Sequence, residues 1–245
     1  TIKESYFHLE RSSIAHSIHG LSYSFTHFHL VFSKIPELYD YKHIISIFRG
    51  KVSHEIGILF LANFLFYFGS NIYFTAYTPF LKYFSFTDST VFLIYAIQTS
   101  TMIAIFFVAP RLIARLGEDR AVLISYAPRI IAVLIAGLII PVVLGTSIFV
   151  VSIISVCLMV VAFSIFSTAS SVIFFKSIPQ GFEGKYLGVH SSVTGIGVFA
   201  GAIVTGQLTN LFGYTILFLI AAIILAMSFI LFRIYLRYRL SHNTV

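Results

Sequence analysis

Six long apolar stretches occupy most of the chain between Ile56 and Phe232. Arg129 is the only charged residue inside them. Because an α-helix rises about 1.5 Å per residue, each stretch is long enough to cross a hydrocarbon layer of about 30 Å. We therefore predict an all-α integral membrane protein with a bundle of six transmembrane helices. The predicted spans are residues 56–77, 90–109, 122–144, 147–175, 186–210 and 214–232.

The composition argues against a water-soluble protein. Hydrophobic residues make up 58% of the chain and charged residues 10%. Helices that are apolar on every side have no polar face to turn to water. The formal net charge is +7, but the basic residues lie between the apolar stretches. The partner they predict is the anionic headgroups of a lipid bilayer, and no nucleic acid.

The distribution of basic residues predicts the orientation. If the segment before Ile56 lies in the cytoplasm and six crossings follow, every Lys and Arg except Lys82 falls on or near the cytoplasmic side. Cytoplasmic loops of membrane proteins carry such an excess of Lys and Arg. We therefore expect a multi-pass protein of the cell membrane with both ends of this chain in the cytoplasm. The expected outer loops are residues 79–89, 144–146 and 211–213, and the expected inner loops are residues 110–121 and 176–185.

Composition also divides the chain into three regions, which are residues 1–55, 56–240 and 241–245. The first is predicted to be a cytoplasmic loop or amphipathic segment, the second the membrane bundle and the third a cytoplasmic tail. Within the first, Ser33–Lys51 has an apolar stripe with basic ends. This pattern fits either a helix on the inner membrane surface or a helix packed under the bundle.

A loop motif joins the second and third predicted spans. Pro110 to Arg120 reads PRLIARLGEDR, which resembles the pattern G-x-L-A-D-R-x-G-R-R of the major facilitator superfamily. Leu112, Arg115 and Gly117 match the Leu, the Arg and the second Gly, whereas Pro110 stands at the first Gly. Gly117 can end a helix in a left-handed conformation, and Arg115 can bind carbonyls or headgroups at the inner edge of the bundle.

A second motif supports the same resemblance. Residues 184–206 are rich in Gly and Ser and are followed by Leu-Phe-Gly-Tyr at 211–214. This looks like the fifth helix and the following turn in the second half of that superfamily. Gly197 and Gly201 form a G-x-x-x-G face, which Gly206 continues. Small residues let helices approach closely, so these glycines predict either static packing or a face on which one half slides.

The resemblance covers residues 56–240 and implies a transporter. It corresponds to the C-terminal six-helix half plus part of the central cytoplasmic loop. It implies secondary active transport of a small-molecule substrate by alternating access, in which a missing N-terminal six-helix half or partner subunit completes the cavity. The absence of an initial Met suggests a fragment or a trimmed chain. The alternative is a non-transporting subunit, or an assembly or regulatory protein, that uses the same helices for contacts.

Polar residues on shared helix faces are the candidate substrate-binding residues. Those of the first span recur at i, i+4, i+7 and i+8, so they lie on one face. The equivalent helix of the family lines the central cavity, and this face is predicted either to contact substrate or to hydrogen-bond neighbouring helices. The candidates are Asn63, Tyr67, Ser70 and Asn71 in the first span, Tyr95 and Gln98 in the second, and Ser164 and Ser167 in the fourth.

Two further polar residues lie toward the predicted inner side. Arg129 follows Pro128 about two turns into the third span, where it either snorkels to the inner headgroups or joins a gating pair. His190 begins the fifth span and fits either a hydrogen-bonded interface residue or a proton-sensitive group. No Asp or Glu lies inside a predicted span, so a proton-coupling carboxylate has no place in this half.

The chain carries no motif of an enzyme or of a cofactor site. It lacks a P-loop, a G-x-S-x-G pattern and an H-E-x-x-H pattern. Cys157 has no second cysteine to pair with, and the pairs His16/His19 and His27/His29 have no acidic or Cys partner at a fixed spacing. We therefore expect no enzymatic activity, no cofactor and no metal site.

Overall fold

The computed structural model describes residues 54–143, 147–178 and 183–242. The chain divides into two compact units, Thr1–Val52 and Ser53–Val245, and only the second is described. The predictions for Ser33–Lys51 and for the histidine pairs His16/His19 and His27/His29 lie outside the described residues. So do the centres of the expected loops at 144–146 and 179–182.

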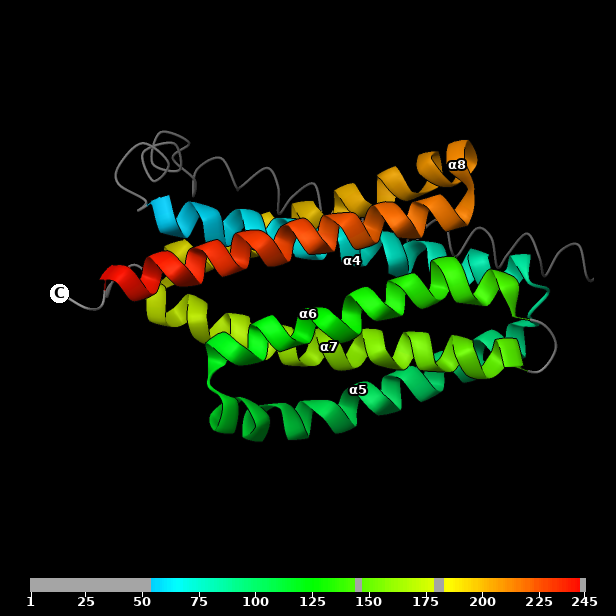
Figure 1. The fold of residues 1–245 in the computed structure, drawn as a ribbon, viewed down its shortest axis with the longest axis horizontal. Helices are drawn as coiled ribbons and strands as arrows, with labels where there is room; N and C mark the ends of the chain where they lie inside the picture. The colour runs from blue at the N-terminus through cyan, green and yellow to red at the C-terminus, as the bar shows by residue number, and fades with distance from the viewer. Residues whose placement is uncertain (1–53, 144–146, 179–182, 243–245) are drawn as a thin grey trace, which may run out of the picture. The chain divides into compact units, whose positions relative to one another are not determined.

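The described part of the chain is entirely helical (Figure 1). The α-helices are α4 (His54–Tyr83), α5 (Asp88–Leu116), α6 (Glu118–Leu134), α7 (Ser147–Ser177) and α8 (Glu183–His242). A π-helical segment, Ile135–Ile139, and a 3-10 turn, Ile140–Val142, extend α6. By length and composition, 5 helices are able to cross a membrane: 56–83, 88–116, 118–142, 147–177 and 183–239. The all-α membrane prediction is confirmed for these residues.

Helix α8 is interrupted at Gly213. This residue has φ 74° and ψ 174°, a backbone conformation that is not helical and that favours glycine. The chain reverses there, so that the two arms of α8, residues 183–212 and 214–242, run back alongside each other (Figure 1). The break falls within the turn predicted at residues 211–213.

Two predicted loops are shorter than expected because the helices continue through prolines. Pro79 lies inside α4 and Pro110 lies inside α5, so only Gly117 separates α5 from α6. Gly117 has φ 79° and caps α5 by donating its N–H to the carbonyl of Ile113. In hydrocarbon a helix is favoured because it keeps its backbone groups hydrogen-bonded internally. A proline removes only one of those bonds. The helices therefore continue past the prolines and end at residues suited to a turn.

Helix α4 packs between the two arms of α8. At Gly69, an added Cβ would lie 3.3 Å from the Ala221 carbonyl of the second arm. On the other side, an added Cβ at Gly197 in the first arm would lie 2.9 Å from the Phe64 carbonyl of α4. Small residues therefore allow backbone-to-backbone contact on both faces of α4.

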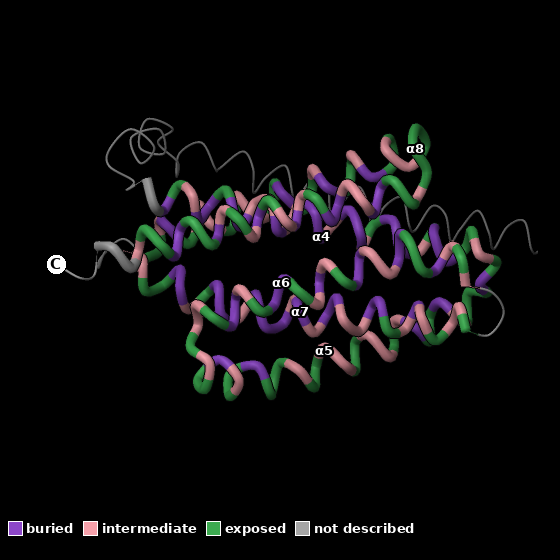
Figure 2. Tube along the Cα trace, viewed as in Figure 1, coloured by how far each residue is buried: buried purple, intermediate pink, exposed green. Residues whose placement is uncertain are grey.

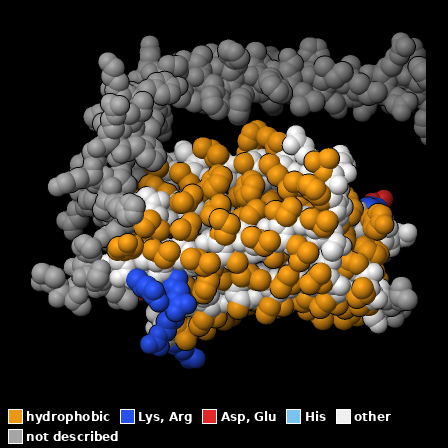
Figure 3. All heavy atoms as spheres, turned by 45° about the horizontal axis from the view of Figure 1, so that its top comes forward, with side chains coloured by type: hydrophobic (Ala, Val, Ile, Leu, Met, Phe, Trp, Pro, Cys, Tyr) orange, Lys and Arg blue, Asp and Glu red, His pale blue; other side chains and the backbone are white. Residues whose placement is uncertain are grey.

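Burial is unequal among the helices. Figure 2 shows buried residues along α4, α6 and α7, whereas α5 at the edge of the bundle is mostly exposed. Helix α5 packs mainly on α7, and Phe92 and Phe107 on its outer side are 76% and 74% exposed. Figure 3 shows a surface covered largely by hydrophobic side chains, with most of the visible Lys and Arg side chains gathered at one edge. Such a surface suits hydrocarbon rather than water.

Candidate functional site

Asn63 on α4 is fully buried and joins two helices. Its Nδ2 donates to the carbonyl of Leu59 at 2.9 Å, and its Oδ1 accepts from Ser170 Oγ of α7 at 3.0 Å. A buried amide is costly unless it is hydrogen-bonded, and here both ends of the amide are used. In this conformation Asn63 therefore links α4 to α7 and does not line an open cavity.

Asn71, eight residues further along α4, turns to a different neighbour. Its Nδ2 donates to the carbonyl of Val198 in the first arm of α8 at 2.6 Å. Ser70 is buried and donates to the carbonyl of Phe66, one turn earlier in its own helix. The structure thus does not gather the four candidates of α4 around one space, because the ends of the stripe face α7 and α8 respectively.

Tyr67 occupies the middle of the stripe and is half-buried. Its ring packs edge-on against Phe163 of α7, with ring centroids 6.2 Å apart. Among the described residues its hydroxyl has no hydrogen-bond partner. Tyr67 is therefore the member of the α4 stripe whose polar group is not used in helix contacts.

Arg129 on α6 lies against the same part of α4. Its Cζ is 4.0 Å from the centroid of the Phe66 ring and 5.5 Å from that of Phe163. The side chain is 0% exposed, and Nε, Nη1 and Nη2 have no hydrogen-bond partner among the described residues. Aromatic faces attract a cation, but they do not replace the hydrogen bonds of a guanidinium.

The prediction that Arg129 snorkels to the membrane surface is wrong. The buried residues of α6 recur every three or four positions, and Arg129 stands in this stripe between Ser125 and Ala132. Its Cβ therefore points into the bundle, and the side chain extends across Phe66 rather than along the helix toward the surface. The second alternative, a gating pair, stays a prediction.

Most of the candidates on α5 and α7 use their polar groups in hydrogen bonds within the bundle. Tyr95 on α5 hydrogen-bonds Thr78 of α4 at 2.7 Å. Ser164 and Ser167 on α7 donate to carbonyls of their own helix, as hydroxyls in apolar helices commonly do. Gln98 on α5 differs, because its Oε1 is buried without a hydrogen-bond partner among the described residues.

Three tyrosines that were not among the predicted site residues connect the helices. Tyr73 bonds Ser155 at 2.8 Å, and Ser155 in turn donates to the carbonyl of Ala132, which ties α4, α7 and α6 together. Tyr77 donates to the carbonyl of Ser152 at 2.6 Å. Tyr126 bonds Ser228, which donates to the carbonyl of Ala62. The spacing of Tyr73 and Tyr77 at i and i+4 was the available signal, on a face of α4 next to the predicted stripe.

The predicted glycine face is divided in the structure. Gly201 lies against α4, where an added Cβ would be 2.7 Å from the Phe68 carbonyl, and Gly197 makes a similar approach. Gly206 has nothing within 4 Å of the position of a Cβ, so it makes no close approach within the described residues. His190, earlier in the same arm, packs against Phe174 with ring centroids 4.4 Å apart and the ring planes tilted by 35°, and its Nε2 has no hydrogen-bond partner among the described residues.

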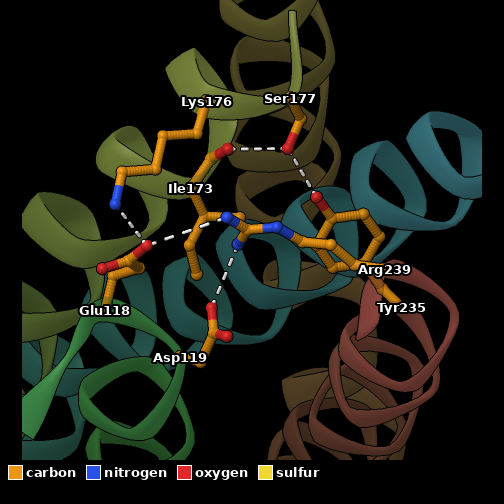
Figure 4. A network of polar contacts seen from close by, with 7 residues as sticks. All are labelled: Glu118, Asp119, Ile173, Lys176, Ser177, Tyr235 and Arg239. Atoms are coloured by element: carbon orange, nitrogen blue, oxygen red, sulfur yellow. Dashed lines mark hydrogen bonds and ion pairs between the residues drawn. The ribbon is translucent and has the colours of Figure 1, made fainter. Parts of the chain in front are cut away.

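The loop motif lies next to an ion-pair network at one end of the bundle (Figure 4). Glu118 of α6 accepts from Lys176 of α7 at 2.6 Å and lies 3.7 Å from Arg239 of α8, which also donates to Asp119 at 3.1 Å. Ser177 and Tyr235 hydrogen-bond at 2.6 Å beside it. The two acids thus hold the ends of α6, α7 and α8 together.

The matched residues of the loop motif itself make fewer contacts. Arg115 is exposed, Leu112 is half-buried, and Pro110 is an exposed residue inside α5. Gly117 supplies the helix end that the pattern predicts, since its positive φ allows α6 to start at the next residue.

Comparison with known proteins adds one positive finding. A family model described as Major Facilitator Superfamily matches residues 59–244, which is more than half of the chain. The match begins in α4 and extends past the end of α8. No curated protein matches the chain.

Proposed function

This chain belongs to the Major Facilitator Superfamily, as its motifs predicted, and from that membership we propose that it is the C-terminal half of a secondary transporter. The proposed activity is the movement of a small solute by alternating access. Members of this family are transporters and not enzymes. The observation that carries the proposal is the family match across all the described helices.

The proposed topology has six crossings. The helix from 183 to 239 would be about 85 Å long at about 1.5 Å per residue, which is far more than a bilayer of about 30 Å requires. The break at Gly213 supports two crossings in its place. With both ends of the chain in the cytoplasm of a cell, the ion-pair network of Glu118 would lie on the inner side, where the basic residues gather.

We further propose that the transport site lies beside α4 and is completed by a second helical half. Two candidates with polar atoms left unused among the described residues support this placement. Tyr67 lies on α4 itself. Gln98 lies on α5 one turn from Tyr95, which bonds Thr78 of α4. Asn71 is only half-buried and lies on the same part of α4. A polar group at membrane depth must face protein or water, so these side chains favour a cavity or a partner surface over lipid.

The test is cysteine accessibility in the complete protein. With Cys157 replaced by Ala, single cysteines at Tyr67 and Gln98 are treated with a membrane-impermeant thiol reagent in right-side-out and in inverted vesicles. Alternating access predicts that each position is labelled from both sides. Ile103→Cys is the matched control, because this exposed apolar position near the middle of α5 faces hydrocarbon and should be labelled from neither side.

A non-transporting subunit is the alternative. The observation favouring it is that Asn63, Ser70 and Ser164 already use their polar groups in helix contacts. This alternative predicts that labelling at Tyr67 and Gln98 never occurs from more than one side. That result would rule out alternating access at this face.

A further inference from the structure

Arg129 is a fixed charge enclosed by the bundle, and no acid of the described residues bonds it. Between Ile56 and Phe232 the acidic residues are Asp88, Glu118, Asp119 and Glu183, and all four stand in the first turn of a helix. Asp88, Glu118 and Asp119 hydrogen-bond Lys82, Lys176 and Arg239 respectively, and the nitrogens of Arg129 have no hydrogen-bond partner among the described residues. Removing a guanidinium from water is costly, so a group that satisfies it is expected during the working cycle.

The surroundings of Arg129 describe what such a group must look like. Phe66 and Phe163 present ring faces to the guanidinium. Tyr126 packs edge-on against Phe66 with centroids 5.5 Å apart, and Tyr67 packs against Phe163. The walls are therefore aromatic, and among the described residues the charged donors beside these rings are the N–H groups of Arg129. A guanidinium binds carboxylates in a two-bond fork, and aromatic walls suit an apolar body attached to that carboxylate.

The exposure of these rings indicates the side from which a ligand would approach. Phe66 and Tyr126 are buried, whereas Tyr67 and Phe163 are half-buried. The way to the guanidinium thus leads past Tyr67 and Phe163, between α4 and α7. This is the face at which the transport site is proposed.

The helix that carries Arg129 is also irregular. Less than two turns beyond it, Ile135–Ile139 is π-helical and Ile140–Val142 is a 3-10 turn. Pro141 cannot donate to the preceding turn, and Gly137 lies against Phe218 of α8. Short π-helical segments inside α-helices often mark functional sites, because they change the direction of the side chains around them.

We propose that Arg129 is the anion-binding group of the transport site and that the solute is an organic carboxylate with an apolar or aromatic body. This inference rests on the proposed transport function. It names the substrate class, which the polar stripe of α4 did not indicate. Arg129 forms the charged contact, and Tyr67 with Phe163 encloses the apolar part of the solute.

The experiment compares two probes of equal shape and different charge. The thermal stability of the complete protein in detergent is measured across concentrations of sodium benzoate and of neutral benzamide, at constant ionic strength. Benzoate should raise the unfolding temperature and benzamide should not. In R129Q the half-saturating concentration of benzoate should increase at least tenfold, whereas R233Q, which removes an exposed arginine, should behave like the wild type.

R129K covers the case in which R129Q does not fold. A lysine keeps the charge but loses the two-bond fork, so the benzoate response should weaken without disappearing. The inference is overturned if benzamide stabilises the protein as well as benzoate does, if benzoate has no effect, or if R129Q responds like the wild type. No benzoate response, combined with destabilisation by R129Q, would instead identify Arg129 as the permanent partner of a carboxylate from another part of the protein.

The two proposals fail in different ways. If cysteines at Tyr67 and Gln98 are labelled from both sides while benzoate has no effect, transport stands and the carboxylate assignment falls. If that labelling never occurs from both sides, the transport proposal fails regardless of the benzoate result.

Discussion

Gly201→Ala tests the close contact between α4 and the first arm of α8. A Cβ at this position would lie 2.7 Å from the Phe68 carbonyl oxygen and 3.1 Å from Asn71 Cβ. The first of these contacts is with backbone, which cannot rotate away. Gly206 lies in the same arm and offers a matched control, because nothing lies within 4 Å of its Cβ position.

Two opposing contributions determine the size of the effect. Replacing a helical Gly with Ala favours folding by roughly 0.5–1 kcal/mol, whereas forcing an atom into a packed contact costs roughly 1–3 kcal/mol. If the helices separate, the bond from Asn71 to Val198 is also lost, at roughly 0.5–1.5 kcal/mol. Together these contributions lead us to expect that Gly201→Ala lowers the free energy of unfolding by about 0.5–4 kcal/mol and that Gly206→Ala raises it by up to about 1 kcal/mol.

The free energy of unfolding is measured for both variants of the complete protein in mixed micelles, with increasing denaturing detergent and with circular dichroism as the signal. Membrane insertion and yield are compared first, so that only folded protein enters the titration. Equal stability of the two alanine variants, or a more stable Gly201→Ala, would show that α4 and the first arm of α8 do not approach as closely as the structure has them.

Three further predictions concern other contacts. Ser170→Ala removes the donor to Asn63 and should destabilise the protein by roughly 1–3 kcal/mol, whereas Ser171→Ala, which removes an exposed hydroxyl bonded within its own helix, should change the same titration little. Glu118→Gln should destabilise by up to about 1 kcal/mol at low salt and by less at high salt, because its partners lie in a partly exposed network. An impermeant thiol reagent applied to intact cells should label Thr87→Cys but not Glu118→Cys, and labelling at Glu118 would reverse the orientation.

The positions of the helices could be predicted from the sequence, because a membrane-spanning helix must have a minimum length and an apolar composition. The break at Gly213 could be predicted for a similar reason, since a sharp reversal needs a residue that tolerates positive φ. The C-terminal ends of α4 and α5 could not be predicted in this way. Pro79 and Pro110 usually indicate turns, but a proline costs a helix a single hydrogen bond when the surrounding turns remain intact.

The candidate site was harder to predict from the sequence, because a shared helix face does not show which neighbouring helix a side chain contacts. Asn63 and Asn71 were placed on one stripe, yet they bond α7 and α8 respectively. That difference depends on how α4 is rotated between its neighbours. The buried residues of α6 recur at three- and four-residue steps, and Arg129 is one of them. The sequence did not predict this face, because α6 is apolar on all sides and no side stands out as the one that faces inward.

The position of α4 between the two arms of α8 has a consequence for biosynthesis. Helix α4 is the first described helix of the chain, but the two segments that pack most closely against it are the arms of α8, which is synthesised last. Ribosomes add about 5–20 residues per second, so on the order of ten to thirty seconds pass between the emergence of Tyr83 and that of His242. During the first part of that interval the Asn71 amide has no Val198 carbonyl to bond, and Gly69 waits longer, until Ala221 in the second arm has been made. A membrane chaperone or insertase that shields polar helix faces would therefore find α4 open for longer than any other described helix.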